Sequence, residues 1–129
     1  MDKKSFFERL NKVLPSYTKV LEIGSAEKNH NNEIIHAIEP DIYNIYHPEE
    51  EIQPEVKYDF IFANTLDIKD HDKILENVKD KLHPQGYIAG DGFIKYMYNY
   101  SKIKNFVEEN KLKMVFATEL GLWAATKIN

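Results

Sequence analysis

The stretch KVLEIGSAEKNHNNEIIHAIEP, residues 19–40, joins an apolar segment to a helical pattern through a single glycine. Residues 19–24 are short, apolar and end at Gly24, which is typical of a buried strand. Asparagines that can cap a helix follow, then isoleucines at helical spacing, and Pro40 ends the pattern. Nucleotide-binding α/β proteins hold their ligands with this strand-glycine-helix layout. The stretch therefore predicts an α/β fold with a loop at the ligand-binding position after its first strand.

The segments on either side continue the alternation of helices and strands. We expect a helix over 4–14, strands over 41–48 and 58–64, a helix over 68–84, a strand over 86–93, a helix within 95–111 and an antiparallel hairpin over 113–128. The segment YDFIFAN, 58–64, is apolar almost throughout, which predicts a strand that is buried on both faces. Parallel strands joined by right-handed crossovers, with a hairpin at the end, predict a three-layer α/β sandwich.

Composition bounds the kind of protein. The chain has 129 residues, of which 43% are hydrophobic, and this predicts a single domain over 1–129. A formal net charge of −4 and a pI near 5.7 argue against a nucleic-acid partner. The absence of cysteine excludes disulfides, thiolate nucleophiles and cysteine-type zinc sites, and the five histidines lack paired spacing, so we expect no metal site. With no signal peptide and no apolar run of roughly 18 to 20 residues, we expect a cytoplasmic protein without membrane contact.

Three stretches resemble the class I S-adenosylmethionine-dependent methyltransferases. VLEIGSA, 20–26, resembles the strand and glycine turn of the family's first motif. YDFIFANTLD, 58–67, followed by a helical pattern and LHPQG, 82–86, resembles the fourth strand, its helix and the Leu-x-Pro-Gly-Gly turn. The segment 113–128 resembles the hairpin peculiar to this fold. The resemblance implies a Rossmann-like methyltransferase fold with a mostly parallel sheet, S-adenosylmethionine (SAM) as the cofactor and methyl transfer to a small-molecule acceptor.

The chain departs from the family in its cofactor motifs. The first motif usually reads acid-x-Gly-x-Gly-x-Gly, but Ala26 and Lys28 stand at the second and third glycine positions. The family ends its second strand in a carboxylate for the ribose hydroxyls, and Tyr46 or His47 stands there instead; neither accepts bidentately as a carboxylate does. About ten residues separate this strand from Tyr58, too few for another strand and its helix. We therefore expect the family's third strand to be missing.

The candidate site residues follow from the ends of the predicted strands. In open α/β sheets, ligands bind beyond the carboxyl ends of the strands, near the point where strand order reverses, which here is the neighbourhood of Gly24, Tyr46, Asn64 and Asp91. The resemblance implies cofactor contacts from Glu22, Gly24, Ser25, Ala26, Tyr46, His47 and Asn64. Among them, Ser25 and backbone N–H groups would hold the methionine carboxylate near the following helix.

Three polar residues are candidates for catalysis, and each has a structural alternative. Asn64 ends the fourth strand of the family pattern, where amino-methylating relatives place an Asn or Asp, but it can equally cap a buried strand. Asp67 can act as a base or as a helix N-cap. Asp91, between two glycines, is the best candidate for an acceptor contact, and its alternative is turn chemistry. The nearby KYMYNY, 95–100, can line an aromatic acceptor pocket or cover a sheet edge.

Two functions from different classes stay open on the sequence alone. The first is an active SAM-dependent methyltransferase. The second is a non-catalytic methyltransferase-like module that binds a protein partner, for which the N-terminal domain of anamorsin-type proteins is a precedent. A third possibility is a site that a partner chain completes by docking along 49–56. The oligomeric state does not follow from the sequence.

Overall fold

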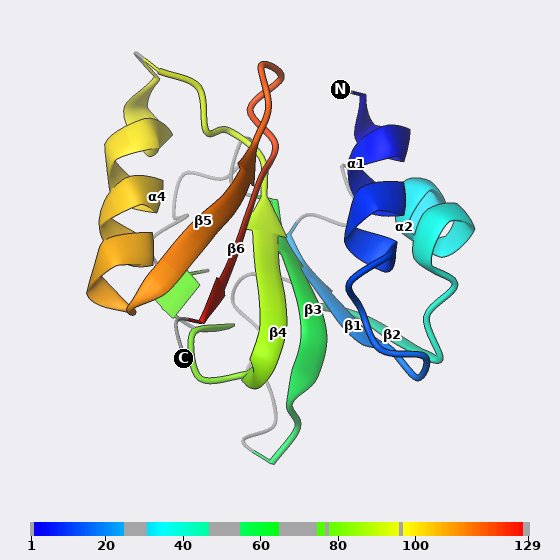
Figure 1. Cartoon of the computed structure of the whole chain (residues 1–129). Helices are drawn as coiled ribbons and strands as arrows, with labels where there is room; N and C mark the ends of the chain where they lie inside the picture. Colours follow the sequence, from blue (N-terminus) through cyan, green and yellow to red (C-terminus); the bar gives the residue numbers. More distant parts are fainter. Residues whose placement is uncertain are drawn as a thin grey trace.

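The computed structural model describes residues 2–24, 31–46, 55–64, 75–76, 78–95 and 97–127. Its labelled elements are, in chain order, α1 (Lys3–Asn11), β1 (Lys19–Ile23), α2 (Asn31–Ile38), β2 (Ile42–Tyr46), β3 (Tyr58–Ala63), β4 (Leu82–Gly90), α4 (Tyr98–Glu109), β5 (Leu112–Ala117) and β6 (Trp123–Lys127). The strands form one six-stranded sheet, with α1 and α2 on one face and α4 on the other (Figure 1). The predicted three-layer α/β architecture is confirmed.

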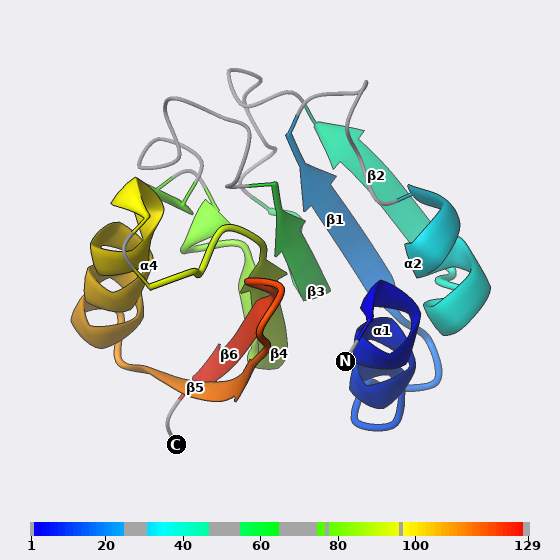
Figure 2. The ribbon, with the colours of Figure 1, turned by 90° about the horizontal axis from the view of Figure 1, so that it is seen from above.

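The sheet has the strand order β2-β1-β3-β4-β6-β5. β2, β1, β3 and β4 run parallel, and β6 lies antiparallel between β4 and β5. The mostly parallel sheet and the C-terminal hairpin are as predicted. From β1 the chain adds β2 on one side and then β3 on the other, so strand order reverses between β1 and β3. Figure 2 shows β1, β2 and β3 side by side, with β1 and β2 pointing toward the same edge.

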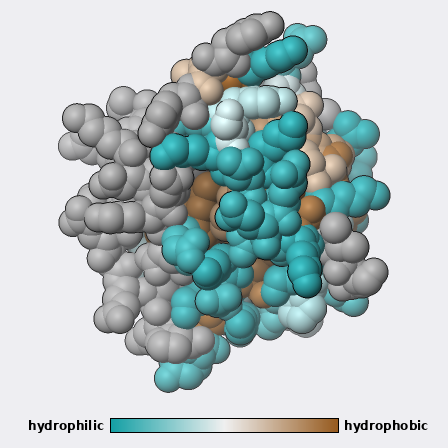
Figure 3. All heavy atoms as spheres, turned by 90° about the vertical axis from the view of Figure 1, so that its left-hand side faces the viewer, coloured by the Kyte–Doolittle hydropathy of each residue, from teal (hydrophilic) through white to brown (hydrophobic). Residues whose placement is uncertain are grey.

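Each face of the sheet carries its own apolar core. The cluster under α1 and α2 is rich in phenylalanine, and the rings of Phe7 and Phe62 lie 5.4 Å apart. The cluster under α4 includes Leu21 and Ile23 of β1, which alternate with Val20 of the other cluster. The outward side of α4 is polar, and the coloured residues on the face seen in Figure 3 are mostly hydrophilic. None of the helices in the described part of the chain has the length and apolar character that a membrane span requires.

The strand β2 is an edge strand of the sheet in the described part of the chain. Its burial is partial, and Ile42 and Ile45 are exposed on opposite faces. On the α4 side, Nδ2 of Asn44 donates a hydrogen bond to the hydroxyl of Tyr58 on β3, 2.9 Å away. Since β1 lies between these two strands, the Tyr58 side chain reaches across it, and burial raises the pKa of Tyr58. The segment 47–54, in which the third strand was expected to be missing, lies outside the described residues.

The predicted boundary between the helix over 68–84 and the strand over 86–93 was wrong. Residues 79 and 80 form a turn, and β4 already begins at Leu82 and ends at Gly90. The strand begins early because Leu82 pairs with Tyr58, whose N–H also donates to the Lys81 carbonyl at 2.7 Å. A register shift follows this pair, and Pro84 falls in the irregular part, where a missing N–H is tolerated. The first helix likewise ends at Asn11 rather than at residue 14.

We predict that Gly90→Ala destabilises the protein by roughly 1–3 kcal/mol, because a larger side chain in a close-packed core forces its neighbours to move. A Cβ at this position would lie 2.7 Å from the Ala63 carbonyl oxygen and 2.7 Å from Nε1 of Trp123. Urea unfolding followed by the fluorescence of the single tryptophan measures this loss. The control is Gln85→Ala, an exposed position on the same strand, which should change the unfolding free energy by less than about 0.5 kcal/mol. Equal stability of the two variants would contradict the prediction.

Candidate functional site

The carboxyl ends of the parallel strands gather the residues that topology predicted. The Gly24 N–H donates to the Tyr46 carbonyl at 2.9 Å, and the Asn64 N–H donates to the Ile23 carbonyl at 2.9 Å. On the other side, Ala63 pairs with Gly90, which places Asp91 next in the row. The four strand ends are therefore adjacent, and the reversal of strand order falls between Gly24 and Asn64.

A buried polar network links three strands just below this row. Glu22 of β1 has no exposed surface, and its side chain accepts hydrogen bonds from both neighbouring strands. The Tyr43 hydroxyl of β2 donates to Oε1, and Nδ2 of Asn64 donates to Oε2 at 2.8 Å. Nδ2 of Asn64 also donates to the Ile23 carbonyl at 3.2 Å, which fixes the side-chain amide between two acceptors. Burial and the hydrogen bond to Glu22 both raise the pKa of Tyr43, so its phenol stays protonated and acts as a donor.

The side-chain oxygen of Asn64 has no hydrogen-bond partner within the described ranges, although the residue is only 2% exposed. Leaving a buried polar atom unpaired costs about 1–3 kcal/mol, so such atoms are rare and call for an explanation. In the described part of the chain, Nε1 of Trp123 is the other buried side-chain atom in this state. Oδ1 of Asn64 lies at the strand ends where ligands of open α/β sheets bind. A ligand that donates a hydrogen bond would satisfy it.

The close approach of the Asn64 side chain requires a glycine at position 24. A Cβ at position 24 would lie 2.6 Å from Cβ and 2.6 Å from Nδ2 of Asn64, and the backbone φ is +156°. No real Cβ makes contacts this short, so any other residue at position 24 would push the amide away from Glu22. The single glycine left in the first motif therefore protects the polar network in addition to shaping the loop.

The other predicted site residues are placed only in part. Ser25, Ala26, His47 and Asp67 lie outside the described residues. Asp91 is 8% exposed, so it is a nearly buried carboxyl group at the end of β4. The Tyr46 side chain packs against the core cluster on the α4 side. Cofactor contact by any of these residues stays a prediction.

An aromatic pair follows Asp91 in the chain. The rings of Phe93 and Tyr100 are stacked with centroids 4.4 Å apart and planes 18° apart, and the Phe93 N–H donates to the Gly121 carbonyl at 3.0 Å. Of the three tyrosines in the KYMYNY segment, Tyr100 is the one whose side chain the structure describes. Tyr96 and the Tyr98 side chain lie outside the described residues.

Tyr43 is a member of the network that the sequence did not reveal. Its Cα partner on β1 is Val20, and it reaches Glu22 along a diagonal of the sheet. Diagonal contacts of this kind depend on strand register and are within reach of a long aromatic side chain. The sequence gives the period of a strand but does not give the register between two strands.

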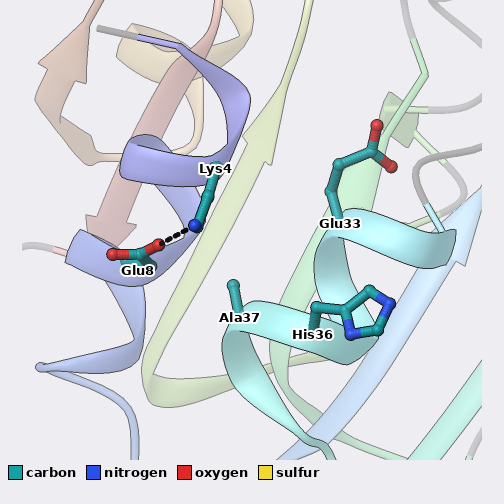
Figure 4. A pocket seen from close by; sticks show the side chains of 5 residues that line it. All are labelled: Lys4, Glu8, Glu33, His36 and Ala37. Atoms are coloured by element: carbon teal, nitrogen blue, oxygen red, sulfur yellow. Dashed lines mark ion pairs between the residues drawn. The ribbon is translucent and has the colours of Figure 1, made fainter.

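A separate pocket lies between α1 and α2 and shares no residue with the network. It has a volume of about 550 Å³ and is lined by Lys4, Glu8, Glu33, His36 and Ala37. Figure 4 shows the Lys4 and Glu8 side chains facing one another on α1, with Nζ and Oε1 4.0 Å apart. Lys4 and Glu8 are exposed, where such pairs contribute about 0–1 kcal/mol. The described residues that line the pocket therefore offer a solvated surface without a buried reactive group.

Comparison with known proteins identifies the fold. No protein-family model and no curated protein matches the sequence. Among solved structures, a SAM-bound amino pentose methyltransferase of Micromonospora echinaspora, CalS10, matches with a TM-score of 0.69 and 8% identity, covering 98% of this chain and 90% of that one. A precorrin-6y C5,15-methyltransferase of Geobacter metallireducens matches with a TM-score of 0.66 and 13% identity, covering 96% and 87%.

A third match is close to this chain in length. It is a SAM-dependent methyltransferase of Aquifex aeolicus, with a TM-score of 0.58 and 14% identity, covering 97% of both chains. At these identities the similarity establishes the fold and no more. The chain has the Rossmann-like fold of the SAM-dependent methyltransferases, as the three motif-like stretches implied.

We predict that Gly24→Ala lowers the unfolding free energy by roughly 1–3 kcal/mol, because the added Cβ displaces the Asn64 side chain. Asn64→Gly removes the atoms that the new Cβ would contact. A double-mutant cycle of the two substitutions, followed by urea unfolding, measures how much of the loss comes from this contact. In the Asn64→Gly background, the cost of Gly24→Ala should fall by at least about 1 kcal/mol. Additive costs would show that the contact between the two residues is not responsible.

Proposed function

We propose that the chain binds SAM at the carboxyl ends of β1 and β3 and transfers its methyl group to a small-molecule acceptor. The observation that carries the proposal is the unpaired Oδ1 of Asn64, buried beside Gly24 at the reversal of strand order. The fold similarity supports the choice of cofactor.

The amino-acid end fits the residues present. Its ammonium group can donate a hydrogen bond, and Oδ1 of Asn64 can accept it. The amide cannot turn its NH2 group toward the ligand without giving up the two hydrogen bonds to Glu22 and Ile23. The Glu22 carboxylate, 2.8 Å behind the amide nitrogen, adds negative potential in a buried environment, where charge interactions are stronger than in water. Both features favour a cation at this point.

The adenosine end fits less well. At the end of β2 the described residues offer Tyr46, whose side chain packs into the core on the α4 side. A tyrosine hydroxyl has one donor and cannot accept from two ribose hydroxyls as a carboxylate does. We therefore infer that the binding free energy comes mainly from the amino-acid end.

The proposed reaction makes few demands on the protein. When bound, SAM supplies a methyl group activated by its positive sulfur; the acceptor's lone pair forms the new bond to carbon, and the carbon–sulfur bonding pair stays on sulfur. The chain has to hold the reactants in line and exclude competing groups. Asp91 is the candidate to take the proton that the acceptor releases, since it is a nearly buried carboxyl group at the end of β4. The stacked Phe93 and Tyr100 are candidates to line the site where the acceptor binds.

The alternative, a non-catalytic module that binds a protein partner, rests on the departures in the cofactor motifs. No contact among the described residues favours it, and the strand ends carry the polar network of Tyr43, Glu22 and Asn64 rather than apolar side chains. Binding measurements separate the two functions, since a module that has lost its ligand has no reason to recognise the amino-acid end of SAM.

We predict that S-adenosylhomocysteine binds and that 5′-methylthioadenosine, which lacks the amino-acid end, binds at least tenfold more weakly; tenfold corresponds to about 1.4 kcal/mol. Isothermal titration with both compounds measures the ratio. Asn64→Ala should weaken the binding of S-adenosylhomocysteine by about tenfold, because it removes the acceptor for the ammonium group. The affinity for 5′-methylthioadenosine should stay unchanged.

Gln85→Ala, at an exposed position of β4, serves as the control and should bind both compounds as the unchanged protein does. The absence of heat with millimolar S-adenosylhomocysteine would contradict the proposed function. Equal affinity for the two compounds would contradict the assignment of Asn64.

A further inference from the structure

We infer that Tyr43 is a positioning residue of the ligand site: by holding the Glu22 carboxylate, it keeps the Asn64 amide turned with its oxygen toward the ligand. The inference deepens the proposed function and rests on it for the identity of the ligand. It adds a residue of β2 that lies below the strand ends and that no motif of the fold points to.

The three side chains of the network lie in order across the sheet. Tyr43 lies on β2, Glu22 on β1 and Asn64 at the end of β3, and β1 is the middle strand of the three (Figure 2). The two oxygens of one carboxylate serve the two neighbours, since Oε1 accepts from Tyr43 and Oε2 accepts from Asn64. A rotation of the carboxylate therefore changes both contacts together.

A side-chain amide has two orientations that differ only in the exchange of oxygen and nitrogen. The hydrogen bonds to Oε2 of Glu22 and to the Ile23 carbonyl select the orientation in which Nδ2 faces inward. The oxygen then faces away from both acceptors and has no partner among the residues that the structure describes. If Glu22 turned away, the choice between the two orientations would rest on the Ile23 contact alone, which is the longer of the two.

Tyr43 can hold Glu22 in place and remain a donor. Its ring packs against the core cluster under α1 and α2, and burial raises the pKa of its hydroxyl. The charged groups near this hydroxyl are Glu22 itself and Glu33 on α2, whose negative charge also favours the neutral phenol. Glu33 is in turn 3.8 Å from Nζ of Lys3 on α1. A fixed ring and a persistent proton make Tyr43 a stable anchor for the carboxylate.

The test compares Tyr43→Phe with Tyr87→Phe, a change of the same size at a half-buried tyrosine of β4 in the same core cluster. The first measurement needs no ligand. The Asn64 side-chain NH2 signals, identified by their loss in Asn64→Ala, are followed by nuclear magnetic resonance. We expect slow solvent exchange of these protons in the unchanged protein and in Tyr87→Phe, and at least fivefold faster exchange in Tyr43→Phe. Unchanged exchange in Tyr43→Phe overturns the inference.

The second measurement is titration with S-adenosylhomocysteine. We expect Tyr43→Phe to weaken binding by about fivefold to tenfold, as for the loss of one net hydrogen bond, and to have no further effect in the Asn64→Ala background. An equal loss in both backgrounds means that Tyr43 supports only the fold, and overturns the inference. If the unchanged protein does not bind S-adenosylhomocysteine, the proposed function fails, while the exchange measurement still decides whether Tyr43 sets the amide.

Discussion

The constraint on which the site depends is the full burial of the Glu22 carboxylate. A buried charge is stable only when hydrogen-bond donors surround it, and removing one partner from such a group is strongly destabilising. Among the described residues, donors come from the strands on either side, Tyr43 of β2 and Asn64 after β3. The carboxylate thus joins the three strands between which the order of the sheet reverses. The position of Asn64 and the small size required at Gly24 both follow from this one requirement.

Much of the fold could be predicted because apolar periodicity reports local structure directly. The apolar run at 58–64 gave a strand buried on both faces, and the ends of the predicted strands gave the row that includes Gly24, Asn64 and Asp91. The start of β4 could not be predicted, because Leu82 continues the helical spacing of the preceding residues and yet pairs with Tyr58 in the sheet. A residue that satisfies both periods is assigned by tertiary contacts alone.

The candidate site was predictable to the level of strand ends and no further. That Glu22 is buried and that Asn64 turns back toward it depend on the register between β1 and β3 and on side-chain rotamers. Tyr43 depends in addition on the register between β1 and β2. The family pattern gave Glu22 and Gly24 a role in the loop after β1, and the structure adds that both are also tied to Asn64. Two residues of the first motif therefore behave as one unit with Asn64, which the sequence assigns to another motif at the end of another strand.

The contact between Asn44 and Tyr58 bears on how the edge of this sheet is covered. On the α4 side, the Tyr58 ring crosses β1 to reach β2, so a side chain of an inner strand covers sheet surface near the edge. In an open α/β sheet, helices cover both faces, and each crossover helix adds length to the chain. Where long side chains of existing strands provide part of the cover, the edge of the sheet needs less secondary structure above it. The Tyr58 side chain thus ties the edge strand β2 to the inner strand β3 and shields the part of β1 that lies between them.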